Sequence, residues 1–338
     1  MKKQTIIKIA TLLLISLTLI SCNPDNEGVF WRMSKSVPKV DVGAITLIKE
    51  NGGDLYAFTT KKGPLQKYSG GSWSVINSDK ARHFTADNTN IYFAKQAEEN
   101  KPNEIWSYKI DDGTLTEIAN GEHILSMVPT FNLVLVKNGN NYDVKEFNIL
   151  TLDDKESYNG FFNVAISPQL IASSNTDYII SGLASGSNSK YVHYDDSGTI
   201  LSVASNQDEF KNYPMIAFAE NGGKSVLLGS NGRIWFNDGS NTLEHKNTIP
   251  SFSAIEPAFM PYPYFIHDGF MYLQNSDFDF YKVDISVGLF EKINSGFAAD
   301  LNYVQANSFL VDGQDVYVGT VANGIFKIDM TNNSATSL

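Results

Sequence analysis

A short run of β-branched and aromatic residues recurs seven times along the chain, and this recurrence constrains the fold more than any other feature. The copies are DLYAF from Asp54, NIYFA from Asn90, LVLVK from Leu133, YIISG from Tyr178, SVLLG from Ser225, FMYLQ from Phe270 and DVYVG from Asp315. Successive copies start 36, 43, 45, 47, 45 and 45 residues apart. Self-similarity at such a period indicates a repeat architecture in which each unit is one supersecondary element.

Each copy belongs to a predicted unit of four strands. A second strand follows every copy, over residues 65–69, 105–111, 144–150, 191–195, 233–237, 279–284 and 324–329. An aromatic residue lies at its centre each time: Tyr68, Tyr108, Phe147, Tyr194, Phe236, Tyr281 and Phe326. An apolar run and a turn such as ENGG at 50–53 precede the copy, and a weaker strand such as 242–245 ends the unit. Runs joined by tight turns predict antiparallel hairpins.

Seven four-stranded units at one period resemble a β-propeller, over residues 44–338. The resemblance implies an all-β, seven-bladed β-propeller with four antiparallel strands per blade, in which neighbouring blades bury one another's faces. The chain resembles WD40, kelch and NHL-like propellers in architecture, without their sequence signatures. A β-helix is the competing repeat fold, but its period is roughly 20–30 residues. A pair of sandwiches would not keep one period through seven copies.

Residues 1–21 have the pattern of a bacterial lipoprotein signal peptide. Three lysines precede a twelve-residue apolar stretch at 9–20, which is too short for a spanning helix. The four residues LISC at 19–22 resemble a lipobox. The resemblance implies cleavage before Cys22, diacylglycerol on its sulfur and an acyl chain such as palmitate on its amino group. Residues 22–43 are then a lipidated tether that includes a candidate ring-closing strand at 30–33.

The lipobox implies a location in the cell envelope, anchored outside the cytoplasm, with the membrane as a partner through the lipid on Cys22. Asn23 after the cysteine, in place of Asp, favours the outer membrane over the inner one if the cell has two. Cys22 is the only cysteine in the chain. An intramolecular disulfide and a cysteine-based metal site or nucleophile in the folded body are therefore excluded.

The charge balance argues against nucleic acid as a partner. The chain has 26 Lys and Arg, 37 Asp and Glu, and a formal net charge of −11. Only three of the basic residues are arginines. Affinity for nucleic acid comes largely from Lys and Arg that neutralise phosphates. The acidic residues are scattered along the chain, which is typical of a solvated surface.

The sequence contains no motif that specifies a reaction, a metal or a cofactor. Paired carboxylates such as Asp111 and Asp112 lie in predicted hairpin turns, where Asp side chains bond their own backbone. Asp277 and Asp279 lack the further oxygen ligands of a calcium loop, and the five histidines lack metal-ligand spacing. No nucleophile elbow, phosphate-binding loop or dinucleotide fingerprint is present. We therefore assign no catalytic residue, metal ligand or cofactor.

Two segments between units form the candidate ligand-binding face. Residues 256–269, EPAFMPYPYFIHDG, combine prolines with aromatic residues, and residues 206–214, NQDEFKNYP, occupy the corresponding place one unit earlier. The candidate residues are Asp208, Glu209, Glu256, Tyr262, Tyr264 and His267. Exposed aromatic residues would give contact area to a partner at low entropic cost. The alternative is that the aromatic residues form an apolar plug packed over the mouth of the channel.

These patterns favour a lipid-anchored, extracytoplasmic propeller that acts as a scaffold for binding a protein or glycan ligand. The alternative is a propeller enzyme, a glycan hydrolase or lyase, with carboxylates near the central channel. Convergence of Asp208, Glu209, Glu256 and His267 on one pocket would favour the enzyme. Aromatic residues on a face without such convergence would favour the scaffold. A structural role in envelope assembly is a third alternative, by analogy with other propeller lipoproteins.

Overall fold

The computed structural model describes a chain built almost entirely of antiparallel strands. The described residues are 43–60, 65–77, 81–95, 102–128, 131–139, 141–148, 151–159, 166–174, 176–184, 188–194, 202–203, 213–240, 242–252 and 262–338. The signal peptide, Cys22 and the predicted closing strand at 30–33 lie outside them. Within this part of the chain, no helix is both long and apolar enough to cross a membrane.

Three sheets have four strands paired in the order of the chain. The first sheet contains β1 (Ile45–Asn51), β2 (Asp54–Thr59), β3 (Leu65–Ser69) and β4 (Ser72–Asn77). The second contains β20 (Tyr264–His267), β21 (Phe270–Gln274), β22 (Phe280–Asp284) and β23 (Leu289–Ile293). The third contains β24 (Ala306–Asp312), β25 (Asp315–Thr320), β26 (Ile325–Asp329) and β27 (Ser334–Ser337). The short helix α3 (Phe297–Asp300) lies between β23 and β24 in the chain.

Two further sheets lie in the middle of the chain. A five-stranded sheet contains β16 (Met215–Asn221), β17 (Lys224–Gly229), β18 (Arg233–Asn237) and β19 (Thr242–Thr248), with β15 (Ser202–Val203) paired parallel to β19. A three-stranded sheet contains β12 (Ile166–Ala172), β13 (Tyr178–Ala184) and β14 (Asn188–Tyr194). The four-stranded antiparallel unit predicted from the repeat is therefore confirmed in β16–β19 as well.

The remaining sheet has seven strands. They are β5 (Ala81–Ala86), β6 (Asn90–Lys95), β7 (Asn103–Lys109), β8 (Leu115–Met127), β9 (Leu133–Asn138), β10 (Asn141–Asn148) and β11 (Thr151–Asn159). The first part of β8 pairs with β7 up to Glu122, and its last part pairs with β9 from His123. One long strand thus ends one unit and begins the next. The described residues form six sheets in place of seven separate ones, and the count of seven blades stays a prediction.

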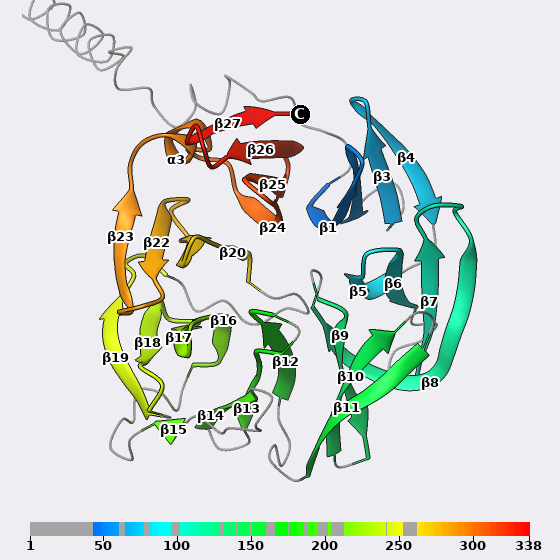
Figure 1. Ribbon diagram of the computed structural model, residues 1–338, viewed down its shortest axis with the longest axis horizontal. Helices are drawn as coiled ribbons and strands as arrows, with labels where there is room; N and C mark the ends of the chain where they lie inside the picture. The colour runs from blue at the N-terminus through cyan, green and yellow to red at the C-terminus, as the bar shows by residue number, and fades with distance from the viewer. Residues whose placement is uncertain are drawn as a thin grey trace, which may run out of the picture. The chain divides into compact units, whose positions relative to one another are not determined.

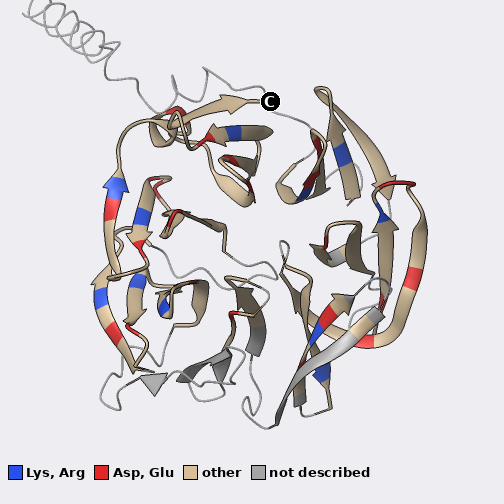
Figure 2. Cartoon of the chain, in the orientation of Figure 1, with Lys and Arg blue, Asp and Glu red and all other residues tan. Residues whose placement is uncertain are grey.

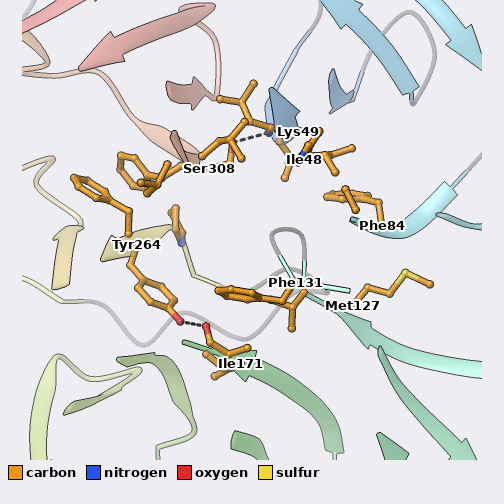
Figure 3. A pocket seen from close by; sticks show the side chains of 18 of the residues that line it. Ile48, Lys49, Phe84, Met127, Phe131, Ile171, Tyr264 and Ser308 are labelled. Atoms are coloured by element: carbon orange, nitrogen blue, oxygen red, sulfur yellow. Dashed lines mark hydrogen bonds between the residues drawn. The ribbon is translucent and has the colours of Figure 1, made fainter. Parts of the chain in front are cut away.

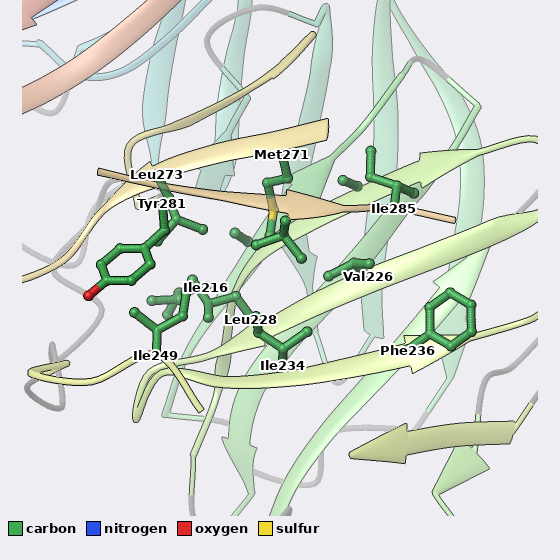
Figure 4. Packing of buried hydrophobic residues seen from close by; sticks show 13 residues of the cluster. Ile216, Val226, Leu228, Ile234, Phe236, Ile249, Met271, Leu273, Tyr281 and Ile285 are labelled. Atoms are coloured by element: carbon green, nitrogen blue, oxygen red, sulfur yellow. The ribbon is translucent and has the colours of Figure 1, made fainter. Parts of the chain in front are cut away.

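The sheets surround a common centre, with the first strand of each unit facing inward (Figure 1). Side chains between the sheets pack into apolar layers. Met271 and Leu273 of β21 lie against Val226 and Leu228 of β17, and all four are fully buried (Figure 4). Burial of one such side chain stabilises the fold by roughly 1.5–3 kcal/mol. Because each sheet buries its faces against its neighbours, the architecture is that of an all-β propeller.

Hydrogen bonds join the first and last sheets of the ring. The backbone N–H of Leu47 in β1 donates to Oγ of Ser308 in β24 at 2.8 Å, and that hydroxyl donates to the carbonyl of Ile45 at 3.1 Å. Nδ2 of Asn307 donates to the same carbonyl at 2.9 Å. A side chain at Gly319 would meet this carbonyl, since an added Cβ would lie 2.4 Å from it. Residues about 260 positions apart therefore close the ring through β1 and β24.

Tight turns set the register of the inner hairpins. In the β1–β2 turn, Gly52 and Gly53 have φ of +63° and +90°, and a carboxylate oxygen of Glu50 accepts the N–H of Gly53 at 2.7 Å. The β16–β17 turn repeats the arrangement, with Glu220 accepting the N–H of Gly223 at 2.6 Å. Glycine adopts positive φ at low cost, as such turns require. The turn predicted from ENGG is thus confirmed at both places.

Candidate functional site

The hub of the ring contains a cavity of about 580 Å³. Its lining residues come from the first strands β1, β5, β12, β20 and β24, from the end of β8, from the residues that follow β5, β8 and β12, and from the two residues before β20. Ligand pockets usually have volumes of roughly 300–1,000 Å³. Side chains that are hundreds of residues apart in the sequence, such as Ile48 and Ser308, lie around this one space (Figure 3).

The wall of the cavity is rich in aromatic and aliphatic side chains. These side chains belong to several elements: Phe84 lies on β5, Phe131 in the loop after β8, Tyr264 and Phe265 on β20, and Phe309 on β24. Phe131 is partly exposed and lies between Met127 and Ile171 in the view of Figure 3. A wall of this kind binds an apolar ligand by burying the ligand's apolar surface. A few polar groups then fix the orientation of the ligand.

Tyr264 ties three strands of the ring together. Its hydroxyl lies 3.0 Å from the carbonyl oxygen of Ala172, at the end of β12, and 2.8 Å from that of Phe218 in β16. Burial raises the pKa of this hydroxyl far above its ordinary value, although the bond to Phe218 opposes the shift. The side chain keeps some exposure, and it lines the cavity. Tyr264 is therefore a structural tie whose side chain also forms part of the cavity wall.

Tyr262, two residues before Tyr264, is held in a similar way. Its hydroxyl donates to the carbonyl of Gln274 at the end of β21, and its ring centre lies 5.3 Å from that of Phe252. Burial again raises the pKa of the hydroxyl. These bonds are the contacts expected of the apolar plug. The role of both tyrosines in binding a partner stays a prediction.

His267 does not share this position. It is the last residue of β20, its Nε2 lies 3.3 Å from a carboxylate oxygen of Asp268, and it does not line the cavity. Asp208, Glu209 and Glu256 lie outside the described residues. The convergence of these residues on one pocket, which would favour an enzyme, therefore stays a prediction. Among the residues that the structure describes, no three His, Cys, Asp or Glu side chains gather as a metal site would require.

Carboxylates of the pairs in the described turns bond nearby lysines. Asp112 accepts hydrogen bonds from Lys109 at 2.7 Å and from the N–H of Thr114 at 3.0 Å, and these bonds lower its pKa to about 2. Asp279 accepts a bond from Lys292 at 2.7 Å. Both arrangements fit a structural role in a hairpin, as the sequence predicted for the first pair.

The sequence analysis missed the residues that line the cavity from the inner strands. These residues lie in, or directly after, the apolar runs that precede the repeated strand of each unit; they include Lys49, Phe84, Phe131 and Phe309. A signal was available, because in a propeller the first strand of every unit faces the centre. Lys49, a charged residue at the end of such a run, is a departure from apolar character that could have been noticed.

The sequence matches no protein-family model and no curated protein. Many solved structures share its architecture, and three of low identity serve as examples. The computationally designed protein Ika8 is 13% identical with a TM-score of 0.52, over 89% of this chain and 87% of that one. Sqt1 of Saccharomyces cerevisiae is 9% identical with a TM-score of 0.53, over 87% and 85%.

The third structure is PorZ, a bacterial surface component of the type-IX secretion system of Porphyromonas gingivalis. It is 11% identical with a TM-score of 0.54, over 88% of this chain and 38% of that one. At these identities, similarity concerns the fold alone. The chain is an all-β propeller with antiparallel four-stranded blades.

Proposed function

We propose that this protein is a lipid-anchored, extracytoplasmic binding scaffold that holds its ligand at the hub of the propeller. The observation that carries the proposal is the cavity of about 580 Å³ lined by the inner strands. Its wall is apolar for the larger part, and among the described lining residues the only carboxylate is that of Asp87. General acid–base chemistry on a glycan needs two carboxyl groups across the substrate. The described wall thus supports binding better than hydrolysis.

The proposed ring has seven blades. In support, the strand β8 is outermost in the unit of β5–β7 and innermost in the unit of β9–β11, so the seven-stranded sheet divides into two blades. The three-stranded sheet β12–β14 counts as a further blade, although the described strand that follows it, β15, pairs with β19 of the next sheet. The period of the seven sequence copies is the second support.

The lipid anchor rests on the lipobox at 19–22. We expect Cys22→Ser to abolish labelling by fatty acid and to move the protein from the membrane fraction to the soluble fraction. Fractionation and metabolic labelling of both proteins in the native host provide the measurement. A Cys22→Ser protein that still carries label and stays with membranes would show that the anchor is misassigned.

Binding at the hub is tested with two variants that differ in location. Phe131→Ala removes a partly exposed ring from the cavity wall, and Leu289→Ser alters an outer residue that is 56% exposed on β23. The wild type and both variants are purified from membranes, and their co-purifying molecules are compared by native mass spectrometry. We expect Phe131→Ala to lose a molecule that Leu289→Ser retains. Equal retention by all three proteins would contradict binding at the hub.

A further inference from the structure

The cavity wall contains one cation and one anion among its described residues. Lys49 of β1 and Asp87, which follows β5, are the only Lys, Arg, Asp or Glu side chains that line it in the described part of the chain. A charged group beside an apolar cavity is costly to desolvate unless it is paired. The hydrogen bonds of the two groups therefore indicate which one is available to a ligand.

Asp87 is engaged within its own turn. One carboxylate oxygen accepts the backbone N–H groups of Thr89 and Asn90, each at 2.7 Å, and the hydroxyl of Thr89 at 3.0 Å. The other oxygen accepts the hydroxyl of Tyr92. Burial raises the pKa of Asp87, but these bonds outweigh it and hold the pKa below its ordinary value. The carboxylate closes the β5–β6 turn and is already satisfied.

Lys49 forms fewer hydrogen bonds than Asp87 does. Its ammonium group carries three N–H donors. Within the described residues it donates one long hydrogen bond, to Oδ1 of Asn88 at 3.4 Å. Asn88 is exposed, and both residues line the cavity. An anion placed beside Lys49 would gain a charge-assisted hydrogen bond, which is roughly twice as strong as one between neutral groups.

The apolar part of the wall lies across the same space. Phe84, Phe131 and Tyr264 line the cavity together with Lys49, and Figure 3 shows them around one opening. A ligand that uses the whole wall thus needs an apolar body and one anionic group. We infer that the hub binds a small apolar carboxylate or sulfonate, with its body against these rings and its anion at Lys49. This inference rests on the proposed function and specifies the chemistry of its ligand.

The test uses two fluorescent probes of the same shape class. One is 1-anilinonaphthalene-8-sulfonate, which is anionic, and the other is N-phenyl-1-naphthylamine, which has the same ring system without the sulfonate. Both are titrated against the full chain solubilised in a non-ionic detergent below its interference level. We expect one saturable site for each probe, with the anionic probe bound about tenfold more tightly because of the charge-assisted bond.

Two matched lysine variants distinguish anion binding at the hub from anion binding at the outer strands. Lys49→Gln keeps a polar side chain and removes the charge at the cavity, whereas Lys327→Gln does the same on the outer strand β26. We expect Lys49→Gln to weaken the anionic probe about tenfold and to leave the neutral probe unchanged. Lys327→Gln should change neither affinity. Dodecanoate should displace the anionic probe from the wild type.

Phe131→Ala separates failure of the inference from failure of the proposed function. We expect it to weaken both probes, because it removes apolar wall area. If Lys49→Gln leaves the ratio of the two affinities unchanged while Phe131→Ala weakens both probes, the hub binds but the anion assignment is wrong. If neither probe shows a saturable site, or Phe131→Ala affects neither, both the inference and hub binding are overturned.

Discussion

Lys67 on β3 and Lys327 on β26 occupy the same place in the first and last sheets. Each forms an ion pair across to the preceding strand, with Asp54 or Asp315, and each ammonium lies over an aromatic ring at 5.8 or 5.9 Å. The inner strands of the same sheets, β1 and β24, bury Ile45, Leu47, Ile48, Phe309 and Leu310. Figure 2 marks lysines and acidic residues along the outer strands.

This difference between inner and outer strands indicates which strands provide most of the stability and which contact a ligand. Ion pairs on an exposed surface contribute about 0–1 kcal/mol each, so the outer strands should tolerate substitution. The inner strands hold the apolar layers, the bonds that close the ring and the cavity wall. Substitutions there should affect stability, binding or both. The predictions below set changes at the hub or ring junction against changes at exposed turns.

The largest effect is expected for Gly319→Ala at the ring junction. The added Cβ would lie 2.4 Å from the carbonyl oxygen of Ile45 and 2.6 Å from Oγ of Ser308, so β25 or β1 has to move. Overpacking of this kind typically costs about 1–3 kcal/mol, and we expect the upper end because backbone is involved. Urea unfolding measures the loss.

Gly313→Ala is the matched control. Gly313 has a φ of +61° in the exposed β24–β25 turn, and an added Cβ would have no atom within 4 Å. Only the cost of a left-handed backbone remains, about 1–2 kcal/mol. Equal losses in the two variants would indicate that the β1–β24 junction does not carry the stability of the ring.

The next effect is expected for Tyr264→Phe. It removes the hydroxyl that bonds the carbonyls of Ala172 and Phe218 and leaves the ring in place. A buried acceptor left without its donor costs about 1–3 kcal/mol. The free energy of unfolding should fall by this amount, while the affinity of the neutral naphthylamine probe stays within about twofold because the ring is retained.

The result distinguishes the two interpretations of residues 256–269. If the tyrosines are exposed anchors for a partner, loss of the hydroxyl leaves the melting temperature unchanged. If they tie the sheets together, as their hydrogen bonds indicate, the melting temperature falls. An unchanged melting temperature for Tyr264→Phe would remove the support for the structural tie.

The smallest effect is expected for Asp112→Asn in the exposed β7–β8 turn. Bonds from Lys109 and Thr114 lower the pKa of Asp112 from 3.8 to about 2. A carboxyl with a lowered folded-state pKa contributes stability above about pH 4, and this contribution is lost as the pH falls towards 2. Because the group is exposed, we expect a melting temperature within about one degree of the wild type at pH 7.

Melting curves at pH 7 and at pH 2.5 provide the measurement. The small difference between Asp112→Asn and the wild type at pH 7 should shrink at pH 2.5, where the wild-type carboxyl is largely protonated in the unfolded chain and partly protonated in the folded one. A loss at pH 7 as large as that of Gly319→Ala would contradict the contrast between outer strands and hub.

Much of the fold could be predicted from the period of the repeat. The strands at 65–69 and 233–237 have the predicted bounds, and the central aromatic residues Phe147, Phe236 and Tyr281 are buried, whereas Tyr68 and Tyr108 are only half-buried. The continuity of β8 could not be predicted in this way. Residues 115–127 contain Gly121, which has a φ of +93°, and a glycine at this place is equally compatible with a turn between two strands.

The candidate site was predicted only in part. Tyr262 and Tyr264 line the cavity, but Tyr264 begins β20, so part of the segment predicted between two units is the first strand of a blade. Their hydrogen bonds to Gln274, Ala172 and Phe218 could not be predicted. The acceptors are backbone carbonyls on other strands, and every residue type has a backbone carbonyl. The same holds for the cavity wall, since a buried Phe and a cavity-lining Phe look alike in an apolar run.

Photolabelling with benzophenone-4-carboxylate tests most directly the claim that the hub is the binding site. This probe has an apolar aromatic body and one anion, and it attaches covalently to side chains beside which it is bound. Peptide mass spectrometry then locates the adducts. The account predicts saturable labelling of residues on β1, β20, β24 or the loop after β8, with loss of labelling in Lys49→Gln. Saturable labelling of outer strands such as β4 or β23, or no saturable labelling at all, would contradict it.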